Sequence, residues 1–98
     1  MVEFIDNAED RTFILKEEVI SAKLLKIEEI LNTFIREDDR NAIIDLANVT
    51  KIDSMSLAAL IRVKNKLGKT GRNLNLINPG EGVMRVLELA GLDAFLLD

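Results

Sequence analysis

The chain begins with two short apolar runs that predict β-strands. They are "VEFI" (2–5) and "TFILK" (12–16), and the polar segment "DNAEDR" between them predicts a turn. From Ser21 to Arg36 the apolar positions recur at spacings of three and four residues, which predicts an amphipathic helix with Ser21 as its N-cap. Its apolar face comprises Leu24, Ile27, Leu31, Phe34 and Ile35.

The middle of the chain predicts a strand and a second helix. "NAIIDLANV" (41–49) is apolar on both faces, which is typical of a central strand covered on two sides. The next helix is expected to start near Asp53 or Ser54 and to run to about Lys69, with Gly71 as a left-handed residue after its end. Its inward face is expected to hold Leu57, Leu60, Ile61 and Leu67.

The last third of the chain predicts one more strand and one more helix. "RNLNLIN" (72–78) alternates as a half-buried strand, and "NPGEG" (78–82) turns the chain. A helix is expected from about Glu81 to Ala90, ended by Gly91. The final segment "DAFLLD" (93–98) is short enough to be a strand, a turn or a frayed end.

The order of elements, β-β-α-β-α-β-α, predicts an α/β fold with a small mixed sheet of about four strands. The unit 42–77 is strand, crossover helix and strand, so its two strands should be parallel. A strand pair precedes this unit, and the helices supply the remaining cover. A length of 98 residues predicts one domain over 1–98.

Composition narrows the possible partners and cofactors. The net charge is -4 and the basic residues form no stripe, which argues against nucleic acid as a partner. The one close basic group, "RVKNKLGKTGR" (62–72), lies at a predicted helix end, where cations complement the helix dipole. The chain has no cysteine and no histidine, so thiol nucleophiles, disulfides, imidazole bases and nearly all zinc chemistry are excluded. No cofactor or metal is therefore expected.

The distribution of apolar residues also bears on location. The start, "MVEFIDNAEDR", has neither the basic nor the apolar region of a signal peptide. The longest apolar run, residues 57–61, is far too short to cross a membrane. We therefore expect a cytoplasmic protein without membrane insertion. The net charge of only -4 and the lack of an exposed patch identifiable from the sequence favour a monomer when the protein is alone.

Carboxylate pairs and a glycine-containing turn are the first candidates for a catalytic or ligand-binding site. Glu17-Glu18, Glu28-Glu29 and Asp38-Asp39 are neighbours in sequence, do not converge on one point, and are interpreted as solvated faces. "NPGEG" before a helix is the kind of place that binds phosphate. It matches no phosphate-binding motif, however, and the turn alone explains its residues.

The stretch "KIDSMSLAAL" (51–60) is the third candidate. Asp53 and Ser54 are preferred N-caps and need no further role. A serine nucleophile would need a base, and the chain offers no histidine and no sign of a lysine or carboxylate in that position, so enzymatic activity is not expected. A hydroxyl at a helix N-terminus is nevertheless well placed for phosphorylation, since the phosphate meets the positive end of the dipole.

These motifs and their order resemble the STAS domain, named for sulfate transporters and anti-sigma factor antagonists. The family shows an apolar strand ending Asp-Leu-Ser, then Asp-Ser-Ser/Thr-Gly-Leu at a helix start, a Pro-containing turn and a helix ending in Gly-Leu. Asp45-Leu46, Ile52-Asp53-Ser54 with Leu57, and Gly91-Leu92 match this pattern. The resemblance covers about 42–97 well and the first 40 residues in element order only.

The resemblance implies a STAS fold, with helices packed mainly on one side of the sheet, and a binding module that is not an enzyme. In the antagonist branch, the partner is an anti-sigma factor that is also a switch-type serine kinase. It phosphorylates the residue after Asp-Ser, which disrupts the complex, and a phosphatase resets it. The implied partner interface here is Asp53, Ser54, Met55, Ser56 and Leu57.

Two positions depart from the family pattern. The acceptor position is Met55, which cannot be phosphorylated, and the family glycine after it is Ser56. The family's Gly-Glu-Leu/Ile-Asp segment aligns with Glu17–Ile20, which lacks the glycine and the aspartate.

Two hypotheses follow. In the first, the chain is an antagonist-like regulator phosphorylated at Ser56 or Ser54. In the second, it is a STAS scaffold without phosphorylation, in a signalling complex or as the accessory subunit of a lipid-transport ABC system. Met55 is then either an exposed apolar contact for the partner or a side chain packed beneath its own helix.

Overall fold

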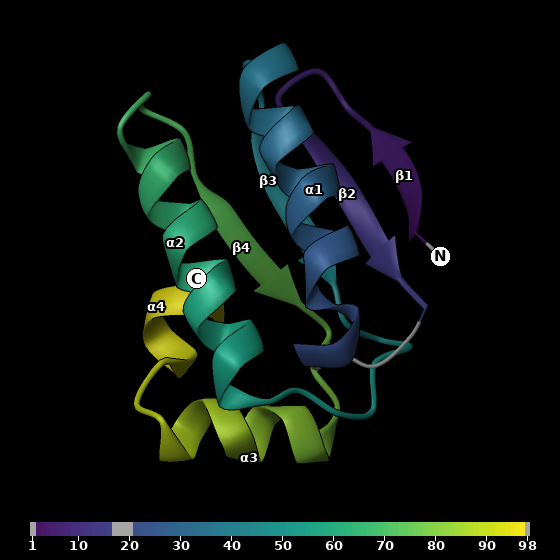
Figure 1. The fold of residues 1–98 in the computed structure, drawn as a ribbon, viewed down its shortest axis with the longest axis vertical. Helices are drawn as coiled ribbons and strands as arrows, with labels where there is room; N and C mark the ends of the chain where they lie inside the picture. The colour runs from purple at the N-terminus through teal and green to yellow at the C-terminus, as the bar shows by residue number, and fades with distance from the viewer. Residues whose placement is uncertain (1, 17–20, 98) are drawn as a thin grey trace.

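The computed structural model describes residues 2–16 and 21–97, with the backbone only for 21–24. The described chain folds into one four-stranded sheet and four helices (Figure 1). In chain order the elements are β1 (Val2–Asp6), β2 (Asp10–Leu15), α1 (Ser21–Glu37), β3 (Asn41–Asp45), α2 (Ser54–Gly68), β4 (Leu74–Ile77), α3 (Glu81–Leu89) and α4 (Asp93–Leu97). The α/β fold and the order of its first seven elements are confirmed.

The sheet is mixed, with the strand order β1-β2-β3-β4. The β1–β2 hairpin is antiparallel, whereas β2–β3 and β3–β4 are parallel, as the crossover helices require. The register places Phe4, Phe13, Ile44 and Leu76 in one row across all four strands. Because side chains alternate between the faces of a strand, this row marks the face that meets the helices.

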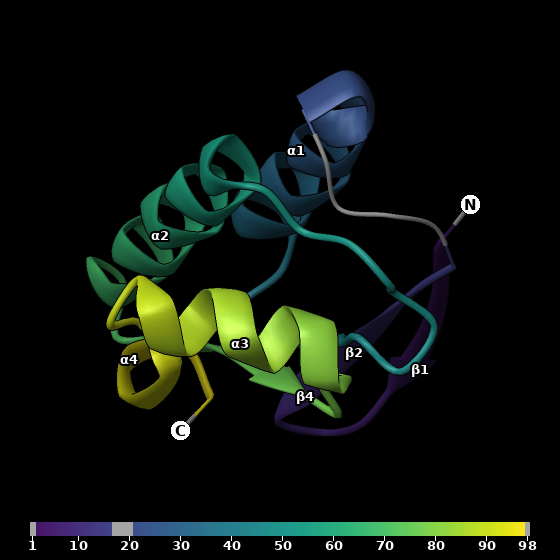
Figure 2. The same cartoon turned by 90° about the horizontal axis from the view of Figure 1, so that it is seen from below.

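The helices lie mainly on one side of the sheet. Figure 2 shows α1 and α2 side by side over one face, α3 across the end of the sheet and α4 beside β4. Between α1 and the sheet, the Phe13 ring contacts the Phe34 ring edge-to-face at a centroid distance of 5.2 Å. The centre of the core is fully buried and contains Ile44, Leu60, Leu67, Leu74, Leu76 and Leu87.

The prediction that the strand at 41–49 is covered on two sides was wrong. β3 ends at Asp45, and Ile43, on the face away from the helices, is only half-buried between Thr12 and Asn75 of the neighbouring strands. The apolar run continues to residue 49 because Leu46 and Val49 are buried within a turn, in which the Val49 N–H donates to the Leu46 carbonyl at 3.0 Å. Apolar residues that enter the core from a loop were mistaken for strand.

Both predicted glycine helix ends are confirmed, and the end of the chain differs from expectation. Gly71 and Gly91 have φ of 74° and 71°, the left-handed conformation that favours glycine. The segment from Asp93 is helix α4, rather than a strand, turn or frayed end, and it buries Leu96 completely. α1 begins at Ser21 itself, and the predicted capping by its side chain lies outside the described atoms.

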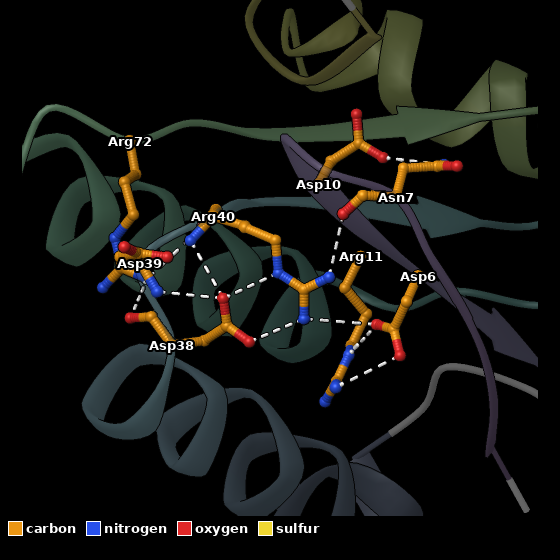
Figure 3. Close-up of polar contacts among 8 residues, drawn as sticks. All are labelled: Asp6, Asn7, Asp10, Arg11, Asp38, Asp39, Arg40 and Arg72. Atoms are coloured by element: carbon orange, nitrogen blue, oxygen red, sulfur yellow. Dashed lines mark hydrogen bonds and ion pairs between the residues drawn. The ribbon is translucent and has the colours of Figure 1, made fainter.

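A cluster of charged residues ties the loops at one end of the sheet together (Figure 3). Arg40 donates to Asp38 (Nη2–Oδ2, 2.7 Å) and to the Asn7 carbonyl in the hairpin turn (2.9 Å), and it also pairs with Asp6 at 3.2 Å. Arg72 donates to the carbonyls of Asp38 at 2.7 Å and Ile35 at 2.8 Å. Three connections that are distant in sequence are therefore held by two guanidinium groups.

Asp38 is the most strongly perturbed carboxyl of this cluster. Its side chain accepts from the Arg40 guanidinium and from the backbone N–H groups of Asp39 and Arg40, which together hold the pKa of the Asp38 carboxyl well below its usual range. The interpretation of Asp38-Asp39 as a solvated pair was therefore wrong for Asp38, because Arg40 lies two residues further on and closes over it.

Removing the charge of Asp38 should destabilise the fold in a pH-dependent way. Because its pKa is lower in the folded chain, Asp38 stabilises the fold above the unfolded pKa of about 4, and this contribution is lost as pH falls. We expect Asp38→Asn to lower the free energy of unfolding by about 1 kcal/mol at pH 7 and by progressively less below about pH 4. Urea unfolding at several pH values measures this, with the exposed Asp39→Asn as control. A pH-independent difference would contradict the assignment.

Candidate functional site

The stretch 53–57 forms the N-terminus of α2. Asp53 is the N-cap: its Oδ1 accepts the N–H of Ser56 at 2.9 Å, and its backbone is extended, with φ of -118° and ψ of 171°. The Leu57 N–H donates to the Asp53 carbonyl at 3.0 Å, closing the first helical turn. The capping role expected for Asp53 is confirmed, and Ser54 is the first residue of the helix.

Of the four residues after the cap, the first two are exposed to solvent and the next two are buried in the core. Ser54 is exposed and 64% of the Met55 side-chain surface is accessible, whereas Ser56 is completely buried and Leu57 is buried at 3%. Met55 is therefore not packed beneath its own helix. The helical period explains the division, because Ser56 shares a face with Leu60, Val63 and Leu67 whereas Met55 does not.

The hydroxyl of Ser56 is buried without a hydrogen bond. Its Oγ has no donor or acceptor partner in the part of the chain that the structure describes. An unsatisfied buried hydroxyl costs free energy, and a phosphate on it would have to displace the first turn of α2. Of the two serines considered as phosphorylation sites, only Ser54 presents its side chain to solvent.

The exposed surface continues along α2 and onto α1. Ala58 and Arg62 are both exposed, three and seven residues after Met55, and therefore on the same side of the helix. Arg62 pairs with Glu28 of α1 at 3.5 Å, which shows that the two helices meet along this side. Leu25, three residues before Glu28, is 74% exposed. Two exposed apolar side chains thus lie near the N-terminal ends of adjacent helices.

Loops from the strand ends hold this end of the molecule together. Asp45, at the end of β3, accepts from the Ala47 N–H at 2.9 Å and from the Asn78 amide at 3.3 Å. Asn78 has a φ of 56°, and Gly82 of α3 lies against the Thr50 carbonyl, since a Cβ there would be 3.7 Å from it. The Asp-Leu strand end therefore braces the loop that leads to α2.

The other sequence candidates show no catalytic or metal-binding arrangement. "NPGEG" forms the turn before α3, with Gly80 as an N-cap that has no side-chain cap bond. Glu28 is paired with Arg62, and Glu17-Glu18 lies outside the described residues, as does the whole Glu17–Ile20 segment. Among residues 2–16 and 21–97, no group of acidic side chains could hold a metal ion, and no helix is long and apolar enough to cross a membrane.

Sequence reasoning did not find the cluster of Asp6, Arg11, Asp38, Arg40 and Arg72. Its members come from β1, β2 and two loops, so no local spacing connects them. The burial of Ser56 did carry a signal, since it lies on the same helical face as the apolar Leu60 and Val63.

Comparison with known proteins identifies the family and the fold. The sequence model of the STAS domain matches residues 1–97. A candidate anti-sigma factor antagonist of Thermotoga maritima superposes with a TM-score of 0.87 at 20% identity, covering 98% of this chain and 83% of its own. Unphosphorylated SpoIIAA, an anti-sigma factor antagonist, gives 0.83 at 19% identity, with 100% and 87% covered.

One similar structure is a small part of a much larger transporter. The murine anion transporter Slc26a9 gives a TM-score of 0.77 at 17% identity, where the match covers 92% of this chain but only 15% of the transporter. No curated protein matches the chain. At these identities the superpositions show the fold alone.

Removing the Ser56 hydroxyl should not destabilise the fold. Because its Oγ is buried and unpaired, we expect Ser56→Ala to raise the free energy of unfolding by about 1 kcal/mol. Thermal and urea unfolding measure this. Ser54→Ala, at the exposed neighbour, is the control and should change stability by less than about 0.5 kcal/mol. A marked loss of stability in Ser56→Ala would show that the hydroxyl has a partner in solution.

Proposed function

Because the chain belongs to the STAS domain family, we propose that it is a protein-binding regulatory module of the anti-sigma factor antagonist kind. It binds an anti-sigma factor or related switch kinase through Asp53, Ser54 and Met55 and the adjoining exposed face of α2. Ser56 and Leu57, which the sequence also suggested for this interface, are buried and face the core. The observation that carries this proposal is the exposure of Met55 at the family's acceptor position. No catalytic role is assigned to any residue.

The exposed end of α2 has the chemistry of a partner contact. Methionine is flexible and polarizable, and it is enriched at protein interfaces, where it adapts to the opposing surface. Met55 is flanked by the exposed Ser54 and Ala58, and the neighbouring helix α1 exposes Leu25 close to its own N-terminal end. The surface thus combines an apolar centre with a polar margin, as protein interfaces do.

Phosphorylation, if it regulates this surface, takes place on Ser54. Ser54 is exposed and Ser56 is buried, so a kinase reaches the first without unfolding the helix. A phosphate on Ser54, the first helical residue, would add about two negative charges at the positive end of the dipole, next to the apolar contact. SpoIIAA has been solved in both its unphosphorylated and its phosphorylated form.

The alternative is a STAS scaffold that binds without being phosphorylated. The residue at the acceptor position supports it, since methionine has no hydroxyl. A signalling complex or a lipid-transport ABC system would use such a subunit, and the similarity to part of Slc26a9 fits the transport alternative only weakly.

Phosphate mapping separates these two functions. We expect that incubation with ATP and the switch-type serine kinases of the source organism places one phosphate on Ser54, detected by mass spectrometry. Ser54→Ala should abolish labelling, whereas Ser56→Ala should retain it. A stable complex without any phosphate would eliminate phosphorylation and leave the scaffold function.

A substitution that introduces a charge at Met55 tests the proposed interface. Met55→Lys should weaken binding to the anti-sigma factor partner by about tenfold or more, because a desolvated lysine replaces an apolar contact. The melting temperature should change little, since Met55 is exposed. Leu89→Lys is the matched control, because Leu89 is also an exposed apolar residue, 83% accessible, on a different helix, α3. If Met55→Lys and Leu89→Lys bind the partner with equal affinity, the interface does not include Met55.

A further inference from the structure

A cleft of about 440 Å³ lies between the β1–β2 hairpin and α1, and none of its lining residues belongs to α2. It exists because α1 packs over the inner strands, which leaves the helix-facing side of the edge strand β1 uncovered. Phe4 of β1 is consequently 50% exposed in the cleft. The floor also contains Phe34 and Arg11, whose guanidinium lies 4.8 Å from the Phe4 ring centroid and 5.7 Å from that of Phe34.

The lining of the cleft has negatively charged side chains that no positively charged side chain in the lining neutralises. Arg11 is bound to Asp6 (Nε–Oδ1, 2.6 Å), and Asp38 is bound to Arg40. Two further carboxylates in the lining, Glu29 and Glu37 of α1, have no ion pair or hydrogen bond with any residue in the described ranges. The rim formed by α1 is therefore acidic, and its charge is available to a cationic partner.

The strand that bounds the cleft is also an open edge. β1 is outermost in the sheet order, and in Figure 1 no strand of the described chain lies on its outer side. Every second residue of such a strand directs its N–H and C=O groups away from the sheet, where they pair with an added strand. Residues of β1 and the acidic rim of α1 line the same cleft, so a segment bound at the strand edge would lie beside the rim.

The spacing of the two carboxylates defines the segment that fits. Glu29 and Glu37 are eight residues apart, which is about 12 Å along a helix. Side chains on one face of a strand, four residues apart, are separated by about 13 Å. The side chain midway between them would lie opposite the exposed Phe4, which favours an apolar residue there.

We propose that β1 and this cleft bind an extended segment of a partner protein, with two basic residues four apart and an apolar residue midway between them. The segment adds to the sheet as a fifth strand beside β1. Pairing of β1 with β1 of a second copy does not fit, because this strand carries Glu3 and Asp6 and no basic residue. The proposal does not depend on the function assigned to α2.

A peptide selection tests the proposal. A phage-displayed library of random linear twelve-residue peptides is selected on the 98-residue chain, and the most enriched peptide is synthesised with a fluorescein label. We expect enrichment of two Lys or Arg residues four apart around an apolar residue. Fluorescence anisotropy then gives the Kd for the variants. Hydrogen exchange of the β1 amides, followed by NMR, should slow when the peptide binds.

Two matched double variants distinguish peptide binding in the cleft from general electrostatic attraction to an acidic protein. Glu29→Gln/Glu37→Gln should raise the Kd about tenfold, whereas Glu81→Gln/Glu88→Gln, the same charge change on α3, should leave it within about twofold. Met55→Lys should leave it unchanged, so failure here is distinct from failure of the α2 interface. Absence of enrichment, peptides without the basic pair, a Kd insensitive to Glu29 and Glu37, or unchanged exchange of β1 would each overturn the proposal.

Discussion

The burial of one sheet face beneath α1 and α2 is the constraint on which the rest of the structure depends. Phe13, Ile44 and Leu76 stand in one row across the sheet and are almost completely inaccessible to water. Shifting any strand by one residue would turn these side chains to the opposite face, so the hydrophobic effect fixes the register. The register in turn fixes where each strand ends and each following loop begins.

The same constraint orients the start of α2. Its inward face must deliver Leu57, Leu60 and Leu67 to the core, and the 3.6-residue period then leaves Met55 facing solvent. Ser56 lies on the buried face, where a glycine of the family would fit without leaving a hydroxyl unpaired. The exposure of the acceptor position is thus a consequence of core packing, whichever residue occupies it.

Much of the fold was predictable from the sequence because its elements have clear local patterns. Gly71 and Gly91 mark helix ends, and Asp53 marks a helix start, through interactions within a few residues. The errors arose where burial is not periodic. Val49 enters the core from a turn, and α4 has only five residues, too few to show a helical period. The Arg40 guanidinium hydrogen-bonds to a segment that is distant in sequence, and no local sequence pattern reveals such a contact.

The one-sided cover of the sheet also explains why binding surfaces remain. Two helices cannot cover the helix-facing side of all four strands, so Phe4 of the edge strand stays partly exposed in the cleft that it lines with residues of α1. The residues of this cleft come from β1, β2 and the middle and C-terminal part of α1, whereas the candidate interface lies at the N-terminus of α2. The two candidate surfaces share no residue, so a substitution in one of them leaves the side chains of the other in place.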